Sequence, residues 1–323
     1  MPDKVKYVSV LMPAFNCSGY IRAAINSVLK QTFKEFELII IDDGSTDRTA
    51  EIVDSISKSE SRVIYRKTAN RGTAAALNYG LSLAGADWVA RIDADDINVP
   101  ARLEKQVKFI DSNPEYDVIS SWSVYFADPA KILFPLREPV EHEDIYLFLD
   151  LHNPLNQSSV IYRKNLIAAA GYNEKFTSYE DFELFHRIRD TVKFYNIPEF
   201  LTFTRVRAGS KSFTDDKKRV YDFLFPNAFK NMIEAKSKGE HFYWAGNIAW
   251  IHFFFGARKD SRSYLKNSFS LKNSLAYATT FLPDKYFNKL IDSRMRYRIT
   301  NFFRSNALFK RELVSLLQQY DVK

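Results

Sequence analysis

The sequence predicts an α/β fold built on an open sheet, and two observations carry this prediction. Strand and helix patterns alternate over roughly the first two hundred residues, and this alternation is typical of such sheets. Phe36–Ile41 is almost continuously apolar, as expected for a central parallel strand that is buried on both faces. Open α/β sheets bind ligands beyond the carboxyl ends of their strands, where polar clusters follow Met12, Ile41 and Ile92.

The first expected elements follow from local patterns. Tyr7–Met12 is a short β-branched, apolar run and predicts a strand, and Ile21–Leu29 has helical periodicity. After the Phe36–Ile41 strand, Thr46 or Asp47 can cap the next helix.

The alternation then continues through the next fifty or so residues. Arg62–Arg66 predicts a short strand, Gly72–Ala84 is rich in Ala and Leu and predicts a helix, and Trp88–Ile92 predicts the next strand. A further helix is expected to begin near Pro100, and another near Glu180.

The character of the chain changes after Thr214, which divides it into an α/β part, 1–214, and a helical part, 215–323. The second part holds four helical patterns, at Asp215–Lys238, His241–Phe255, Asp260–Ser270 and Tyr286–Gln319. No apolar run is long enough to predict a membrane span. The N-terminus lacks a signal-peptide pattern and the single cysteine, Cys17, excludes a disulfide framework, so we expect a cytoplasmic protein.

The net charge of +7 is unevenly distributed. Val220–Lys323 carries 17 Lys and Arg against 8 Asp and Glu, which leaves 29 against 31 for the residues before it. A basic, aromatic C-terminal part favours an anionic partner. We therefore expect 215–323 to contact an anionic membrane surface peripherally, at the inner face of the cell membrane, or to recognise a lipid-linked pyrophosphate acceptor. A solvated basic face or self-association into an oligomer would also explain this composition.

Three carboxylates follow the Trp88–Ile92 strand within four residues, at Asp93, Asp95 and Asp96. Alternating strand geometry would place Asp93 and Asp95 on one side, close enough to share a cation. Mg²⁺ and Mn²⁺ prefer oxygen ligands, and Mg²⁺ often lies between carboxylates and substrate phosphates. The alternative is a loop whose acids cap the helix near Pro100.

Two further acidic motifs have a functional and a structural interpretation. Asp42-Asp43-Gly44-Ser45 could accept hydrogen bonds from a base or a ribose, or it is an ordinary strand-to-helix turn. Glu180-Asp181 could supply a general base, or it places acids favourably in the first turn of a helix. The chain has neither G-x-G-x-x-G nor G-x-x-x-x-G-K-[ST], which argues against dinucleotide cofactors and P-loop chemistry.

Together, these motifs and several others resemble family-two glycosyltransferases with the GT-A fold. The resemblance covers about residues 5–212 and rests on several ordered motifs. They are Val8-Ser9-Val10-Leu11-Met12-Pro13-Ala14-Phe15-Asn16, Gln31-Thr32-Phe33, Asp42-Asp43-Gly44-Ser45-Thr46-Asp47, Asn70-Arg71-Gly72 with Ala76 and Asn78, Asp93-Ala94-Asp95-Asp96, Glu180-Asp181, and the segment Arg205–Ser212.

The resemblance implies a GT-A fold, a Rossmann-like open mixed sheet flanked by helices, with a C-terminal helical region. It also implies inverting transfer of a sugar from a nucleotide diphosphate, with UDP expected, to a glycan or glycolipid hydroxyl such as an O-antigen or capsule intermediate. The implied nucleotide-sugar site comprises Pro13, Ala14, Phe15, Asn16, Asp43, Arg71, Gly72, Asp93, Ala94 and Asp95.

The same resemblance implies a divalent cation, Mn²⁺ or Mg²⁺, held mainly by Asp95 with support from Asp93 and Asp96. Asp181 matches the catalytic base, and Glu180, Arg205 and Arg207 match contacts to acceptor or diphosphate. Arg207 stands where the family often has a His, and an Arg could pair with phosphate but could not ligate the cation.

Two other functions remain open at this point. The fold could serve as a non-catalytic nucleotide-sugar-binding scaffold, although the presence of both Asp95 and Asp181 argues against it. A sugar nucleotidyltransferase would need a glycine-rich basic loop where Pro13-Ala14-Phe15-Asn16 stands. Nucleic acid is not an expected partner, because the basic tail lacks any recognised binding module.

Overall fold

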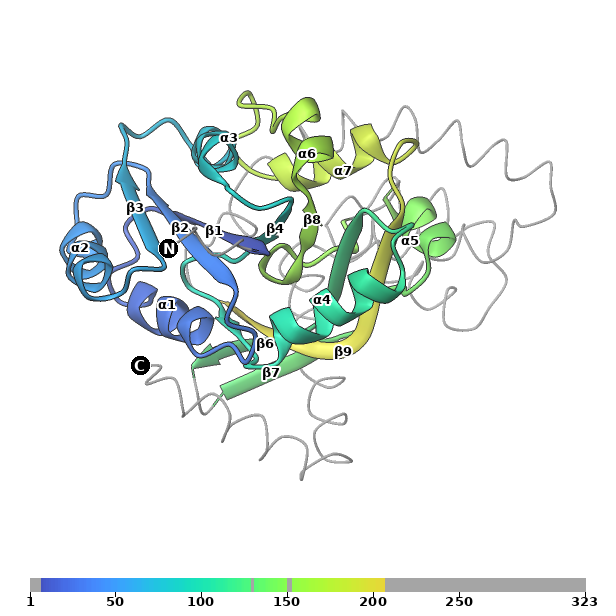
Figure 1. The fold of residues 1–323 in the computed structure, drawn as a ribbon, viewed down its shortest axis with the longest axis horizontal. Helices are drawn as coiled ribbons and strands as arrows, with labels where there is room; N and C mark the ends of the chain where they lie inside the picture. Colours follow the sequence, from blue (N-terminus) through green and yellow to red (C-terminus); the bar gives the residue numbers. More distant parts are fainter. Residues whose placement is uncertain (1–6, 129–130, 150–152, 207–323) are drawn as a thin grey trace, which may run out of the picture. The chain divides into compact units, whose positions relative to one another are not determined.

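The computed structural model describes residues 7–128, 131–149 and 153–206 (Figure 1). Within these ranges the chain forms a nine-stranded sheet in the order β3-β2-β1-β4-β8-β6-β9-β5, and β7 pairs with β6. The expected boundary near Thr214, the helical part 215–323 and the Arg207 side chain lie outside the described residues.

One half of the sheet is parallel, as the alternation of strands and helices predicts. β1 (Val8–Ala14) pairs with both β2 (Phe36–Asp42) and β4 (Trp88–Arg91), and β2 pairs with β3 (Val63–Lys67). Every residue of β2 and β4 is buried, which confirms Phe36–Ile41 as a central strand covered on both faces. The carboxyl ends of these strands therefore lie at one edge of the sheet.

The other half of the sheet makes it mixed. β8 (Ile161–Arg163) is antiparallel to β4 and to β6 (Val118–Asp128). β9 (Phe194–Arg205) is parallel to β6 and antiparallel to the short β5 (Ile97–Asn98). A hairpin adds β7 (Lys131–Leu136) to β6. The mixed sheet flanked by helices confirms the expected fold class.

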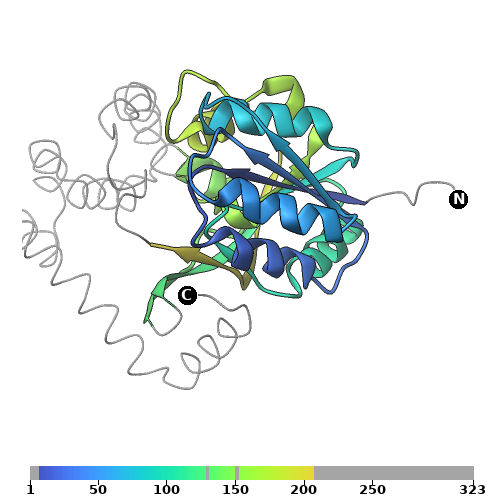
Figure 2. The same ribbon diagram turned by 90° about the vertical axis from the view of Figure 1, so that its left-hand side faces the viewer.

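Helices cover both faces of the sheet (Figures 1 and 2). α1 (Ile21–Leu29) contacts α2 (Thr49–Ser59) on one face, and α3 (Thr73–Leu83) packs on β1 and β2 from the other. The remaining helices are α4 (Arg102–Ser112), α5 (His142–Phe148), the 3₁₀ turn η1 (Gln157–Ser159), α6 (Lys164–Ala170) and α7 (Glu180–Ile188).

The close approach of α3 to the sheet depends on a small side chain. A Cβ atom built on Gly80 would lie only 2.1 Å from Leu11 Cδ1 of β1. Any larger residue at position 80 would push α3 away from the strand. Since α3 begins directly after Gly72, the packing of α3 on the sheet also fixes the position of the loop that ends at Gly72.

Candidate active site

Two groups of residues meet the edge where β1, β2 and β4 end. We call the first the strand-end loops, residues 14–18, 42–47 and 68–72. We call the second the carboxylate cluster, which consists of Asp93, Asp95, Asp96, Glu180 and Asp181. Because β1 pairs in parallel with both β2 and β4, the loops after these strands lie on the same side of the sheet.

Asp43 organises the strand-end loops from a buried position. Its carboxylate accepts the backbone N–H groups of Arg71 at 2.9 Å and Gly72 at 2.7 Å, and the hydroxyl of Thr68 at 3.3 Å. Gly72, at φ 95°, is in a region that favours glycine and precedes α3. A carboxylate offers about four acceptor positions, so these three bonds leave room for one more donor.

Asn16 joins the first two loops. Its side-chain oxygen accepts the backbone N–H of Thr46 at 2.9 Å, and its own N–H donates to Ser45 Oγ at 2.9 Å. Asn16 itself has a positive φ of 47°, which Asn tolerates better than most residues. Next to it, Phe15 is 43% exposed. Pro13 and Ala14 are the last two residues of β1.

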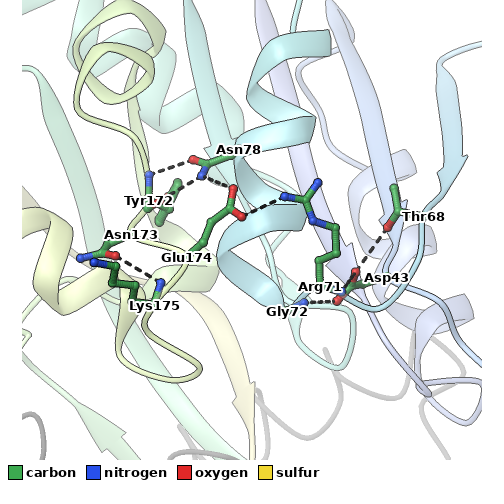
Figure 3. A network of polar contacts seen from close by, with 9 residues as sticks. All are labelled: Asp43, Thr68, Arg71, Gly72, Asn78, Tyr172, Asn173, Glu174 and Lys175. Atoms are coloured by element: carbon green, nitrogen blue, oxygen red, sulfur yellow. Dashed lines mark hydrogen bonds and ion pairs between the residues drawn. The ribbon is translucent and has the colours of Figure 1, made fainter.

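Arg71 connects the strand-end loops to the segment before α7 (Figure 3). Its guanidinium forms an ion pair with Glu174 at 3.1 Å, and Asn78 Nδ2 donates to the same carboxylate at 3.3 Å. Asn78 also exchanges two hydrogen bonds with the backbone of Tyr172, at 2.8 and 2.9 Å. The predicted nucleotide contact at Arg71 is therefore engaged with a carboxylate in this structure.

The acids after β4 form a turn rather than a continued strand. β4 ends at Arg91, and the N–H of Asp96 donates to the carbonyl of Asp93 at 3.1 Å. The strand alternation that we expected for Asp93 and Asp95 is therefore wrong, because the chain turns before the pair is complete. Both residues nevertheless remain partly exposed, whereas Ala94 and Asp96 are buried. The alternative that these acids cap the next helix is not supported, since the cap of α4 is Ala101 without a side-chain bond.

Asp96 and Arg205 hold this turn from beneath. The carboxylate of Asp96 accepts the backbone N–H of Arg205 at 2.7 Å, and Arg205 Nε donates to the carbonyl of Asp95 at 3.0 Å. The buried guanidinium of Arg205 also lies over the rings of Tyr20 and Phe126, at 4.7 and 4.5 Å. Burial, together with the charges of Asp95 and Asp93, raises the pKa of Asp96 well above its usual value. Asp96 thus faces inward and supports the turn.

Glu180 and Asp181 open α7, as the sequence predicts. Asp181 Oδ2 accepts a hydrogen bond from Asn153 Nδ2 at 2.9 Å. Burial raises the pKa of Asp181, although the charge of Arg91 acts in the opposite direction. Burial and the neighbouring charge of Asp181 raise the pKa of Glu180 to about 7. A carboxylate with a raised pKa is a stronger base, and this suits proton abstraction near neutral pH.

Several residues outside the predicted site support the carboxylate cluster. Arg91 lies between the turn and α7, Asn153 contacts Asp181, and Ser158 Oγ accepts the backbone N–H of Asp93 at 2.9 Å. One signal could have indicated Arg91, because a charged residue that ends an apolar strand beside acids needs partners. The polar run from Asn156 to Ser159 offered a weaker signal.

The turn after β4 offers carboxylate oxygens, the kind of ligand that a divalent cation prefers. Among the described residues, no three His, Cys, Asp or Glu side chains converge into a group that could hold a metal ion. Asp93 and Asp95 offer carboxylate oxygens, and Mg²⁺ commonly combines one or two carboxylates with substrate phosphates. The residues present therefore fit a cation whose remaining ligands come from a diphosphate.

None of the helices in the described part of the chain has the length and apolar content needed to cross a membrane.

Comparison with known proteins defines the class of this fold and site. The profile of glycosyl transferase family 2 matches residues 9–175, about half of the chain. The chain therefore belongs to glycosyl transferase family 2, which confirms the resemblance to that family.

Individual relatives agree with this assignment. The chain is 32% identical to the putative glycosyltransferase EpsE of Bacillus subtilis over 232 residues, 68% of this chain and 79% of EpsE. It is 30% identical to the amylovoran biosynthesis glycosyltransferase AmsE of Erwinia amylovora over 220 residues, 67% of this chain and 81% of AmsE.

Solved structures share the fold. TarS of S. aureus, residues 1–349 in complex with UDP-GlcNAc, gives a TM-score of 0.59 at 19% identity, over 97% of this chain and 90% of that one. The mannosyltransferase PcManGT of Pyrobaculum calidifontis, in complex with GDP-Man and Mn²⁺, gives 0.53 at 15% identity, over 99% and 88%. The chain is thus a glycosyltransferase with a GT-A type fold.

Proposed function

We propose that this glycosyltransferase inverts the anomeric configuration of its sugar and uses Asp181 as the general base. The observation that carries the proposal is the setting of Asp181. Its carboxylate is partly buried at the start of α7, is oriented by Asn153 and has a raised pKa. Asp93 influences the same carboxylate electrostatically, so the base and the turn after β4 are neighbours.

The proposed reaction is a single displacement at the anomeric carbon. Asp181 takes the proton of the acceptor hydroxyl while the acceptor oxygen forms a bond to that carbon. The bond from the carbon to the diphosphate oxygen breaks, and the nucleoside diphosphate leaves from the opposite face. A positioned base contributes about 10²–10⁴-fold to such a step.

For the donor we propose a UDP-sugar bound across the strand-end loops. Asp43 has one acceptor position to offer a base or ribose, and Phe15 provides an exposed ring. Arg71 would exchange Glu174 for the nucleotide. TarS, whose structure contains UDP-GlcNAc, supports UDP, and PcManGT, whose structure contains GDP-Man, is the reason to test GDP as well.

We further propose a Mn²⁺ or Mg²⁺ ion held by Asp95 and Asp93, with Asp96 in support. When bound, it would supply positive charge against the charge that develops on the leaving diphosphate. The protein contributes the fixed turn, because Arg205 and Ser158 hold its backbone. Glu180, Arg205 and Arg207 stay predictions as contacts to acceptor or diphosphate.

The proposed acceptor is a glycan or glycolipid intermediate of a surface polysaccharide. AmsE, the amylovoran biosynthesis glycosyltransferase, is the relative that supports it. The basic composition of 215–323 supports a peripheral contact at the inner face of the cell membrane. Quantitative recovery in the soluble fraction, with no binding to anionic vesicles at low salt, would contradict that contact.

The test is release of nucleoside diphosphate from a panel of UDP-, GDP- and dTDP-sugars, with Mn²⁺, Mg²⁺ or EDTA. We expect slow hydrolysis of one donor, abolished by EDTA and by Asp95→Ala. Donor binding is measured in parallel by thermal shift. Absence of both turnover and thermal shift across the panel would contradict the donor assignment. Binding without turnover, even after addition of lipid-linked acceptors, would favour a nucleotide-sugar-binding scaffold.

A further inference from the structure

Arg91 occupies a position between the two acidic segments of the site. It is the last residue of β4, and its side chain is 3% exposed. Nη2 lies 2.9 Å from Asp93 Oδ1 and 3.7 Å from Glu180 Oε1, and Nη1 donates to Gln157. One guanidinium therefore contacts the turn that follows β4 and the first residue of α7.

A second buried arginine, Arg102, offers a contrast to this pairing. Arg102 is fully buried, but its partners are neutral oxygens of Asn98, Gln106 and Val160. It stabilises α4 without touching a carboxylate. Both arginines are therefore buried, but Arg91 contacts charged carboxylates whereas Arg102 contacts neutral oxygens.

The start of α7 needs an external tether. Tyr179, which precedes Glu180, has a left-handed backbone with φ 61°, a conformation that is unfavourable for a residue other than glycine. No side-chain hydrogen bond caps the helix at this residue. The ion pair from Arg91 reaches Glu180, directly beside Asp181, and so restrains the first turn of α7.

We propose that Arg91 is a positioning residue for the transfer reaction: its guanidinium ties the turn at Asp93 to Glu180 and thereby fixes Asp181 relative to the donor diphosphate. The inference rests on the proposed function of Asp181 as base. A base displaced by about 1 Å can lose about 10²-fold in rate. Arg91 acts through its carboxylate partners and does not touch the reacting atoms.

The experiment is a double-mutant cycle between positions 91 and 180. We expect Arg91→Gln and Glu180→Gln each to lower kcat about 10²-fold, with the donor Kd within about threefold of wild type. The double variant should lose no more than either single variant, since both break the same tether. It removes both charges and leaves only the partly exposed Asp93 without this partner, so it remains measurable if Arg91→Gln alone fails to fold.

Two outcomes would overturn the proposal. If the folded double variant recovers kcat to within about threefold of wild type, Arg91 only compensates a buried charge. If the two losses multiply to about 10⁴-fold, the residues act independently. Arg102→Gln is the matched control, with a lower Tm and kcat within about threefold of wild type. If the wild type itself shows no turnover, the result contradicts the proposed function and not the role of Arg91.

A second measurement needs no substrate or metal. Hydrogen exchange of peptides covering residues 179–185 should be faster in Arg91→Gln than in wild type, because the first turn of α7 opens more often. Exchange in Ile21–Leu29 should stay unchanged, and Arg102→Gln should leave 179–185 as in wild type. Equal protection of 179–185 in Arg91→Gln and wild type would exclude the tether.

Discussion

The strand-end loops and the carboxylate cluster both use acids, but they hold them in opposite ways. In the loops, backbone N–H groups donate to Asp42, Asp43 and Asp47, so the ionised form is satisfied. In the cluster, burial raises the pKa of Glu180 and Asp181, and Arg91 provides the opposing charge. Hydrogen bonds stabilise the carboxylates of the loops, whereas burial of the carboxylates in the cluster costs stability and raises their proton affinity.

Asp181→Asn should have the largest effect of any single change. We expect kcat to fall about 10²–10⁴-fold, because the amide cannot accept the proton, while the donor Kd stays within about threefold. Steady-state transfer and donor titration measure the two quantities. In the wild type, the acidic limb of the kcat/KM profile should lie above the ordinary pKa of Asp, since burial raises the pKa of Asp181. An Asp181→Asn enzyme with wild-type kcat would exclude this base.

Glu180→Gln should remove a pH-dependent loss of stability. The pKa of Glu180 is raised from 4.5 to about 7 by burial and by Asp181. The contribution of protonated Glu180 to the free energy of unfolding is therefore fully present below pH 4.5 and is lost as the pH rises through about 7. A shift of this size corresponds to about 3 kcal/mol at most. Denaturant unfolding at pH 5 and pH 8 should show a smaller drop in the free energy of unfolding for the variant than for wild type. If the free energy of unfolding falls equally in the variant and the wild type, Glu180 is not the source of the pH dependence.

How much of the structure the sequence predicts differs from one element to the next. Ile21–Leu29 and the buried Phe36–Ile41 strand are predicted almost to the residue, because local periodicity and apolar content decide them. The geometry of Asp93 and Asp95 is not, because a turn closed by Asp96 replaces the expected strand.

The supporting contacts are harder still to predict. Asn153 and Asp181 are 28 residues apart, and no local pattern links them. The half of the sheet that contains β6, β8 and β9 arises from long-range pairing, which periodicity does not encode. The resemblance indicated the acids themselves, whereas the structure is needed to see that Arg91 lies between them.

Asp43→Asn tests the strand-end loops at a buried carboxylate. The amide nitrogen would replace one carboxylate oxygen and face the N–H group of either Arg71 or Gly72, which donate to different oxygens. Hydrogen bonds to a charged group contribute about 1.5–3 kcal/mol each. We expect the free energy of unfolding to fall by about 2 kcal/mol and the donor Kd to rise at least about tenfold. Arg71→Ala is the control for stability, because it keeps the backbone donor and removes only the exposed pair with Glu174. If Arg71→Ala lowers the free energy of unfolding as much as Asp43→Asn does, the stability comes from the Arg71 side chain and not from the backbone hydrogen bonds to Asp43.

The smallest expected effect belongs to Asp47, at the start of α2. Partial burial raises its pKa, but hydrogen bonds from Thr49 and Ser18 outweigh this and lower the pKa to about 2. Its contribution is therefore present above the ordinary pKa of 3.8 and is lost as the pH falls toward 2, opposite in sign to Glu180.

Asp47→Ala should lower the free energy of unfolding by about 1 kcal/mol at pH 7, the usual net contribution of a hydrogen bond. The difference from wild type should shrink as the pH falls from 5 to 2, measured by denaturant unfolding. Asp54→Ala, which removes an exposed pair with Lys58 inside the same helix, is the matched control and should cost less. If the two variants behave alike, the hydrogen bonds at Asp47 do not stabilise the loop, and the contrast with the carboxylate cluster would rest on Asp43 alone.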